Sequence, residues 1–224
     1  MTTAVDVAVI DYGMGNLHSV AKALQRVAPK ANVWVGDDPT IIRRANRVVY
    51  PGVGAIRDCM GEVRRRGLDE VIVEVARSKP LLGICVGMQG LMHHSSENNG
   101  IDCLDVFPDE VVFFGDAFAK DACLSSAQQR LKVPHMGWNT VQQCHPHPLW
   151  KGIKNNARFY FVHSYFVGAK SCLSTVGITQ YGLDIAAAIA RDNIFAVQFH
   201  PEKSHRDGLQ LLDNFMQWDG NYSC

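Results

Sequence analysis

The first 94 residues alternate between two patterns of apolar positions. Short β-branched runs, the first marked by Val5, Val7 and Val9, predict strands, whereas apolar residues spaced three or four apart predict helices. The predicted strands cover 5–9, 32–36, 47–54 and 80–85, and the predicted helices cover 18–27, 39–46, 59–78 with a break at Gly67, and a segment that begins at 86. Such alternation indicates a mostly parallel sheet that is covered by helices on both faces.

The second half of the chain changes character. Consecutive strands joined by turns are predicted over 158–167, 173–182, 184–192 and 193–200. A closing amphipathic helix is predicted over 205–218, with one apolar face made by Leu209, Leu212, Phe215 and Met216. Weak periodicity over 115–132 indicates a surface excursion. We therefore expect one α/β domain over 1–224, with an antiparallel extension of the sheet in its C-terminal half.

Composition and charge exclude several classes of protein. Lys+Arg and Asp+Glu number 22 each, so the formal net charge is +0, which argues against binding to nucleic acid or to a membrane surface through charge. Seven cysteines show no CxxC pair, and the first residues lack the basic start and apolar stretch of a signal peptide. No apolar run approaches the roughly 20 residues of a membrane helix. We expect a reduced cytoplasmic protein with free thiols.

Cys85 lies between a predicted strand and a predicted helix in the pattern G-x-C-x-G, from Gly83 to Gly87. The pattern is mechanically similar to the nucleophile elbow, in which small flanking residues allow a sharp turn that displays the nucleophile. Free N–H groups at the start of the following helix favour a thiolate there. The alternative is a small buried hydrophobe, which most free cysteines are. None of the other six cysteines shares this context.

A cysteine nucleophile needs a base and a group that orients the base, and HPE at 200–202 offers both. His200 ends an apolar strand, and Glu202 lies on the same side of the chain if it stays extended. Glu202 would then hold His200 in the tautomer that leaves one nitrogen facing Cys85. The alternative is a helix start, with Pro201 and Glu202 opening a turn before the last helix.

A second glycine turn, YPGVGA at 50–55, ends a neighbouring predicted strand. Glycines let a main chain approach a ligand closely, so N–H groups at Gly52, Val53 and Gly54 could bind an oxyanion beside Cys85. Taken alone the pattern is weak, because most such turns are only turns.

Together these motifs resemble those of the class I (triad-type) glutamine amidotransferases. GICVGMQ (83–89) is similar to the family's nucleophile motif, HPE (200–202) to its histidine–glutamate pair and PGVG (51–54) to its oxyanion strand. The resemblance implies a flavodoxin-like α/β fold and a glutaminase activity. It also implies that Cys85 attacks the side-chain amide of glutamine, that His200 transfers protons and that Glu202 orients His200.

The same resemblance implies a substrate site. Two main-chain N–H groups, from Val86 and from the Gly52–Val53 turn, would bind the oxyanion, after a flip of the Gly52–Val53 peptide. Gln89 and Glu97 would hold the amide and amino ends of glutamine. Main-chain groups of His163, Ser164 and Tyr165 would support the bound glutamine. No cofactor is implied.

Two further motifs, DYGMGN (11–16) and VPHMGWN (133–139), are similar to a branch of the family that works in histidine biosynthesis. Members of that branch dock on a (β/α)₈-barrel cyclase subunit, which receives the ammonia before solvent can protonate it. The residues that match the partner-facing positions are Asn16, Met136, Trp138 and Asn139. Trp138 could instead be a core aromatic. Residues 115–132 form a longer segment before PHMGWN than the resemblance implies for many relatives.

Other functions remain open at this stage. The chain could serve another amidotransferase, in anthranilate, aminodeoxychorismate or pyridoxal phosphate synthesis, although VPHMGWN argues against that. It could be a cysteine peptidase on a similar fold, or a partner-binding module without catalysis. A metal site is not expected, because the close histidine pairs His93–His94 and His145–His147 lack a second ligand pair at zinc-like spacing.

Overall fold

The computed structural model describes residues 4–120, 131–170 and 172–222. Its main sheet has nine strands in the order β2-β1-β3-β4-β13-β12-β11-β8-β9. The first part of this sheet is parallel: β1 pairs with β2 and β3, β3 pairs with β4, and β4 pairs with β13. These strands are β1 (Val7–Ile10), β2 (Val33–Gly36), β3 (Arg47–Gly52), β4 (Leu81–Cys85) and β13 (Ile194–Val197). The predicted parallel core is confirmed.

The sheet continues as an antiparallel extension from β13 onward, as predicted. Its strands are β12 (Leu183–Arg191), β11 (Thr175–Tyr181), β8 (His135–Gln143) and β9 (Ala157–His163). The sequence did not lead us to predict β8, because its apolar residues are interrupted by Gly137 and by polar side chains. Strand β8 pairs with β11 and β9 within the sheet and leaves Met136 and Trp138 exposed.

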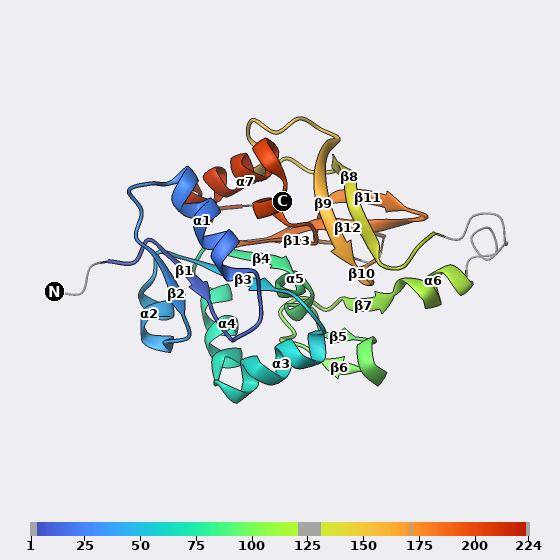
Figure 1. Ribbon diagram of the computed structural model, residues 1–224, viewed down its shortest axis with the longest axis horizontal. Coiled ribbons are helices and arrows are strands. Elements are labelled where there is room, and N and C mark those ends of the chain that lie inside the picture. The colour runs from blue at the N-terminus through green and yellow to red at the C-terminus, as the bar shows by residue number, and fades with distance from the viewer. Residues whose placement is uncertain (1–3, 121–130, 171, 223–224) are drawn as a thin grey trace.

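Helices cover both faces of the parallel part (Figure 1). Helix α1 (Leu17–Val27) contacts α7 (His205–Gln217) on one side, while α2 (Pro39–Arg44), α3 (Ile56–Arg65) and α4 (Leu68–Ala76) gather on the other. The predicted break at Gly67 is confirmed: its φ is 64°, a left-handed conformation that glycine adopts without strain and that separates α3 from α4. The predicted apolar face of α7 packs Leu212, Phe215 and Met216 into the core.

A second, four-stranded sheet was not predicted. Its order is β10-β7-β5-β6, and its strands are β5 (His94–Ser95), β6 (Ile101–Asp102), β7 (Glu110–Phe113) and β10 (Tyr165–Val167). The predicted strand over 158–167 therefore divides at Ser164, and β9 and β10 join different sheets. Segments this short carry too few alternating positions for a clear signal.

Two other expectations from the sequence need correction or restriction. The helix expected from residue 86 is only α5 (Val86–Gly90), because the chain turns after Leu91 to enter β5. The excursion expected over 115–132 begins as α6 (Phe114–Lys120), while residues 121–130 lie outside the described part of the chain.

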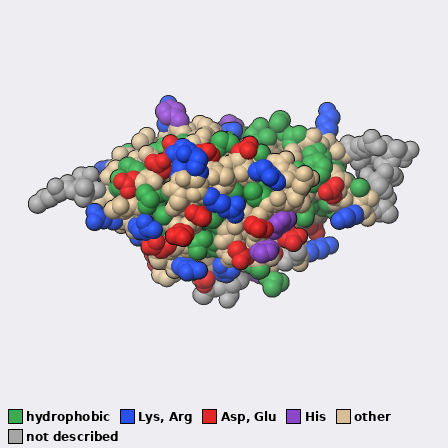
Figure 2. Space-filling model, turned by 90° about the horizontal axis from the view of Figure 1, so that it is seen from below, with side chains coloured by type: hydrophobic (Ala, Val, Ile, Leu, Met, Phe, Trp, Pro, Cys, Tyr) green, Lys and Arg blue, Asp and Glu red, His purple; other side chains and the backbone are tan. Residues whose placement is uncertain are grey.

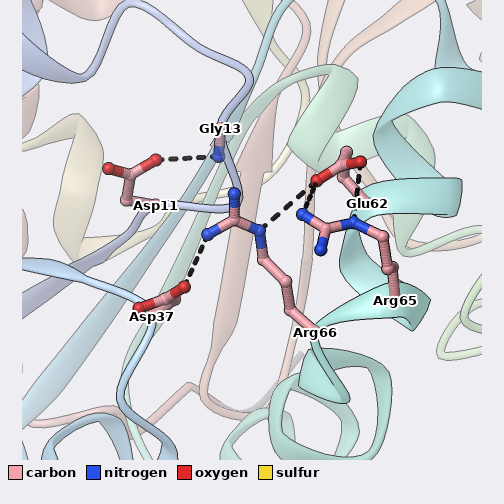
Figure 3. A network of polar contacts seen from close by, with 6 residues as sticks. All are labelled: Asp11, Gly13, Asp37, Glu62, Arg65 and Arg66. Atoms are coloured by element: carbon pink, nitrogen blue, oxygen red, sulfur yellow. Dashed lines mark hydrogen bonds and ion pairs between the residues drawn. The ribbon is translucent and has the colours of Figure 1, made fainter.

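The surface carries charges of both signs, and basic and acidic side chains intermix on the face shown in Figure 2. One network links the segment after β2 to α3: Arg66 Nη1 lies 2.5 Å from Asp37 Oδ2 and Arg66 Nε lies 3.4 Å from Glu62 Oε2, beside the Gly13 turn (Figure 3). Across residues 4–120, 131–170 and 172–222, no helix has both the length and the apolar character that a bilayer crossing requires.

Candidate active site

The three sequence motifs meet at one edge of the main sheet. Because β3, β4 and β13 are parallel neighbours, their carboxyl ends lie side by side. Gly52 at the end of β3 pairs in register with Cys85 at the end of β4, and Val197 of β13 pairs with Ile84. His200 follows three residues after Val197. The fold thus gathers the glycine turn, the cysteine and the histidine around a common point.

Cys85 occupies a sharp strand-to-helix turn. Its φ is 55° and its ψ is −110°, a conformation that costs a non-glycine residue free energy and recurs at functional sites. The flanking glycines are required by close packing: a Cβ on Gly87 would lie 1.8 Å from the Tyr50 carbonyl oxygen, and one on Gly83 would lie 2.9 Å from Ala196 Cβ. The geometry is that of the predicted nucleophile elbow.

Helix α5 contributes less to the electrostatics of the elbow than the sequence suggested. It has five residues, so few peptide dipoles align behind Cys85. The local N–H groups at the turn and the side chains around Cys85 therefore matter more for the charge on its sulfur than a helix macrodipole does.

His200 and Glu202 form a buried pair. His200 Nδ1 lies 2.8 Å from Glu202 Oε1, and the two side chains are 2% and 1% exposed. Burial alone lowers the pKa of His200, but its interactions with Cys85 and Glu202 outweigh burial and raise that pKa to about 10. The alternative interpretation of HPE is also partly right, since Pro201–Lys203 forms a short 3₁₀ turn before α7. Both structural features coexist at this point.

A cavity of about 510 Å³ lies over these groups. Ten of the residues predicted for catalysis, substrate binding or partner docking line it: Asn16, Val53, Cys85, Val86, Gln89, Glu97, His163, Ser164, Tyr165 and His200. The lining also includes Gly54, which belongs to the predicted glycine turn, and three residues to which the sequence assigned no role: Pro134, Val162 and Lys203. Gly52 and Glu202 lie behind this lining. The sequence prediction and the geometry therefore converge on one cavity.

The glycine turn after β3 is held from two sides. Tyr12 donates a hydrogen bond from its hydroxyl to Pro51 O (2.8 Å), and Cys59 Sγ contacts Val53 O at 3.4 Å. Burial raises the pKa of the Tyr12 hydroxyl, so it stays protonated as a donor. A Cβ on Gly52 would lie 2.5 Å from the Tyr12 hydroxyl and 2.9 Å from Val86 Cβ. The turn thus packs directly against the start of α5, and only glycine fits there.

The predicted substrate residues Gln89 and Glu97 are both engaged with the protein. Gln89 Nε2 donates to Tyr165 O (3.0 Å) and to Gln198 Oε1 (2.9 Å). Glu97 Oε2 accepts from the main-chain N–H of Ile56, the first residue of α3, at 3.1 Å. Burial raises the pKa of Glu97, and the Ile56 hydrogen bond opposes that shift. These contacts fix the direction of both side chains along the cavity wall.

One polar residue beside the nucleophile escaped the sequence analysis. Gln198 is 0% exposed and donates from Nε2 to Cys85 Sγ at 3.7 Å. It follows directly after β13 and precedes His200 by two residues, so the period-2 argument that paired His200 with Glu202 would place its side chain on the same side if the strand continued to His200. The sequence pattern alone assigns Gln198 no function, because a glutamine after an apolar strand resembles an ordinary buried polar residue.

The residues predicted to face a partner divide between the cavity and the strand beside it. Asn16 lines the cavity, whereas Met136, Trp138 and Asn139 lie along β8. Met136 is 61% exposed and Trp138 is 37% exposed, so Trp138 is not a core aromatic. The Trp138 ring stacks on His205 with centroids 4.8 Å apart and planes 6° apart. A partly apolar strand face thus adjoins the mouth of the cavity.

Comparison with known proteins agrees with this geometry. The sequence matches the family "Glutamine amidotransferase class-I" over residues 8–218. It is 59% identical over 216 residues to imidazole glycerol phosphate synthase subunit HisH 1 of Pseudomonas aeruginosa, and 59% identical over 216 residues to the HisH subunit of Pseudomonas putida. These alignments cover 96% of this chain and 98% and 99% of the two relatives.

A solved structure with a distant sequence shares the architecture. The structure of PurLQS from Thermotoga maritima matches with a TM-score of 0.67 at 15% identity, over 96% of this chain and 99% of that chain. At this identity the match bears on the fold alone. Fold, family match and close relatives lead to the same conclusion: the chain belongs to the class-I glutamine amidotransferase family.

Proposed function

We propose that this chain is the glutaminase subunit of imidazole glycerol phosphate synthase and supplies ammonia to a cyclase subunit in histidine biosynthesis. The observation that carries the proposal is Cys85, held at φ 55° in a cavity that it shares with His200, whose ring is paired with the buried Glu202. The relatives at 59% identity, which bear the name of that subunit, support the choice among amidotransferases.

In the proposed reaction the Cys85 sulfur attacks the side-chain carbonyl carbon of glutamine. The carbonyl oxygen becomes an oxyanion, and the C–N bond then breaks while protonated His200 gives a proton to the leaving nitrogen. Ammonia departs and a glutamyl thioester remains on Cys85. His200 next takes a proton from water, the resulting hydroxide adds to the thioester carbon, and glutamate and the free cysteine are released. The raised pKa of His200 supports its role as the proton donor in the first step.

The oxyanion would be stabilised by main-chain N–H groups of Val86 and of the Gly52–Val53 turn, because these lie at adjacent strand ends in register. Gln89, Glu97 and main-chain groups of residues 163–165 would bind the rest of glutamine. Their positions on one cavity wall support this assignment.

The partner in this proposal is a (β/α)₈-barrel cyclase that docks on Asn16, Met136, Trp138 and Asn139. The exposed apolar side chains of β8 next to the cavity mouth support a docking surface there, because an interface at that point would keep ammonia out of solvent. We further propose a single domain and a cytoplasmic location, which suits the free thiols of Cys59, Cys85, Cys103, Cys144 and Cys172.

The test is glutamate release from glutamine in three samples: the chain alone, the chain with the cyclase of the same organism, and that complex with the cyclase's nucleotide ligand. Cys85→Ala serves as the control in each sample, and Cys144→Ala is matched to it, because Cys144 is an exposed thiol outside the cavity. We expect low activity alone, a large rise in the full complex, and loss of activity in Cys85→Ala only.

Two outcomes would contradict the proposal. Strong activity that ignores the cyclase would keep Cys85 as nucleophile but remove the synthase assignment. Cleavage of peptides without release of glutamate from glutamine would favour the cysteine peptidase instead.

A further inference from the structure

A continuous series of hydrogen bonds through four buried side chains runs from β8 to the nucleophile. It joins His135 Nδ1 to His163 Nε2 (2.9 Å), His163 Nδ1 to Tyr165 O (2.8 Å), and Tyr165 O to Gln89 Nε2 (3.0 Å). From Gln89 Nε2 it continues to Gln198 Oε1 (2.9 Å), and from Gln198 Nε2 to Cys85 Sγ (3.7 Å). The side chains of His135, His163, Gln89 and Gln198, which make up the series, are all buried.

The direction of every bond in this series follows from one group. The Tyr165 carbonyl oxygen can only accept, so both atoms that contact it must donate. His163 therefore carries its hydrogen on Nδ1, and the atom of Gln89 facing Tyr165 must be the amide nitrogen. A main-chain carbonyl thus settles a histidine tautomer and an amide orientation that would otherwise be ambiguous.

The second hydrogen of Gln89 Nε2 then determines how Gln198 lies. This hydrogen points at Gln198, so the side-chain oxygen of Gln198 must accept it. The amide nitrogen of Gln198 consequently faces the Cys85 sulfur. The reverse orientation of Gln198 would bring two donors together at Gln89 and aim an oxygen at the sulfur. Gln198 is thus held as a donor to Cys85 by bonds that originate outside the triad.

The histidines extend the same logic away from the cavity. His163 Nε2 must accept, so His135 donates from Nδ1, and His135 Nε2 is left to accept from Asn139 Nδ2 at 3.3 Å. This arrangement requires both rings to be neutral. Burial lowers the pKa of His135 to about 4 and that of His163 to about 3, which agrees with neutral rings.

We propose that Gln198 is a positioning residue for the Cys85 nucleophile: it donates to the sulfur in an orientation that Gln89 and the Tyr165 carbonyl impose. The inference rests on the proposed function, because it assigns Gln198 to the step in which Cys85 attacks. A donor at this point stabilises negative charge on the sulfur and restricts its direction. With both hydrogens of its Nε2 engaged, Gln89 can offer glutamine only Oε1, and a ligand donating there would polarise the series toward Cys85.

The test measures the thiolate directly, in the chain by itself. The rate of Cys85 alkylation by iodoacetamide, located by peptide mass spectrometry, is followed against pH in the unmodified chain, Gln198→Glu and Gln198→Met. Gln198→Glu keeps the acceptor for Gln89 and removes the donor to sulfur, while Gln198→Met removes both at similar length. We expect the midpoint of the alkylation profile to rise by about one to two pH units, the effect of losing a hydrogen bond to a charged group.

Glutamine hydrolysis by the full complex gives the second readout. Because Gln198→Glu removes the donor to the sulfur and keeps the acceptor for Gln89, its kcat should fall about ten- to a hundredfold while its KM changes by less than about threefold. Gln217→Glu is the matched control: Gln217 is exposed at the end of α7 and lies outside the cavity, so both readouts should stay unchanged. The alkylation profile of the exposed Cys144 is an internal control in every sample.

An alkylation midpoint equal to that of the unmodified chain in a folded Gln198 variant would overturn the proposal, even if activity fell, because that result would assign Gln198 to packing alone. If Gln198→Glu shows no cooperative thermal transition and is therefore not folded, the alkylation midpoint of Gln198→Met tests the proposal instead. The alkylation arm needs neither glutamine nor the cyclase. A shifted midpoint, together with no glutaminase activity of the unmodified chain even in the full complex, would therefore refute the proposed function and leave the assignment of Gln198 intact.

Discussion

Two buried histidine pairs in this molecule have opposite electrostatic character. At the end of β13, His200 Nδ1 lies 2.8 Å from Glu202 Oε1, whereas between β8 and β9 His135 Nδ1 lies 2.9 Å from His163 Nε2. Both pairs are buried, and both hydrogen bonds have ordinary lengths. Interactions with Cys85 and Glu202 raise the pKa of His200 to about 10, while burial lowers those of His135 and His163 to about 4 and about 3.

The difference teaches that the neighbour, rather than burial, decides the charge of a histidine in this fold. Desolvation acts in the same direction on all three rings, and only His200 has a carboxylate and a thiol that overcome it. The His200–Glu202 pair is suited to carry a proton, whereas the His135–His163 pair is suited to hold fixed hydrogen-bond directions. The predictions below test that division of roles.

The largest effect is expected for Glu202→Gln, which removes the carboxylate and nearly preserves the shape. The pKa of His200 should then fall, because Glu202 no longer opposes burial and only the interactions with Cys85 still raise it. Glutamine hydrolysis by the full complex should fall on the order of 10³- to 10⁴-fold, as when the orienting carboxylate of a triad is neutralised. Steady-state kinetics measures the loss, and histidine NMR titration measures the pKa of His200.

The control for this change is Glu110→Gln, because Glu110 is exposed on β7 and outside the cavity. It should leave kinetics unchanged. Activity in Glu202→Gln that stays within about tenfold of the unmodified chain would show that Glu202 does not control His200.

The pH dependence of stability should separate the two pairs by sign. His135, His147 and His163 have folded pKa values below the unfolded value of 6.5, so the unfolded chain binds more protons and stability falls as pH drops below 6.5. Each ring contributes a slope of up to about 1.4 kcal/mol per pH unit. His200, with a folded pKa of about 10, stabilises fully below pH 6.5 and loses that contribution as pH rises through 10. Urea unfolding midpoints from pH 5 to pH 10 test both expectations. A midpoint that does not change below pH 6.5 would contradict the lowered pKa values of His135 and His163, and one that does not change toward pH 10 would contradict the raised pKa of His200.

The two pairs also differ in how far their contacts could be predicted from the sequence. The proximity of Cys85, His200 and Glu202 could be predicted, because a glycine bracket and the short HPE spacing give local signals and parallel strands bring their carboxyl ends together. The strands of the parallel core and the break at Gly67 followed from periodicity for the same reason: each signal is contained within a few residues.

The His135–His163 pair could not be found that way. It depends on the antiparallel register of β8 with β9, in which His135 lies opposite His163, and β8 itself was not predicted. The orientation of the Gln198 amide likewise depends on a hydrogen bond from Gln89, which is 109 residues away in the chain. Pairings of this kind are set by register between distant segments, and the sequence pattern of one segment does not contain them.

A smaller effect is expected when the second pair is broken. His135→Phe keeps an aromatic ring that can stack on Phe161 and Tyr181, but it leaves His163 Nε2 without its donor. A buried acceptor without a partner should lower the free energy of unfolding by about 1–3 kcal/mol. Urea denaturation at pH 7.5 measures this, and His145→Phe, at an exposed position, should change it little. Equal stabilities of the two variants would contradict a structural role for the pair.

The smallest effect should come from the exposed charges drawn in Figure 3. Arg66 contacts Asp37 and Glu62 much as His200 contacts Glu202, yet its side chain is 27% exposed and that of Asp37 is 51% exposed. Water and salt screen such contacts, so Arg66→Ala should cost about 0.5–1 kcal/mol at low salt and less at 1 M salt. Arg65→Ala, which removes a more exposed partner of the same Glu62, should cost less still. A loss above about 2 kcal/mol that persists at high salt would mean that Arg66 holds the Gly13 turn through packing rather than charge, because only packing is insensitive to salt.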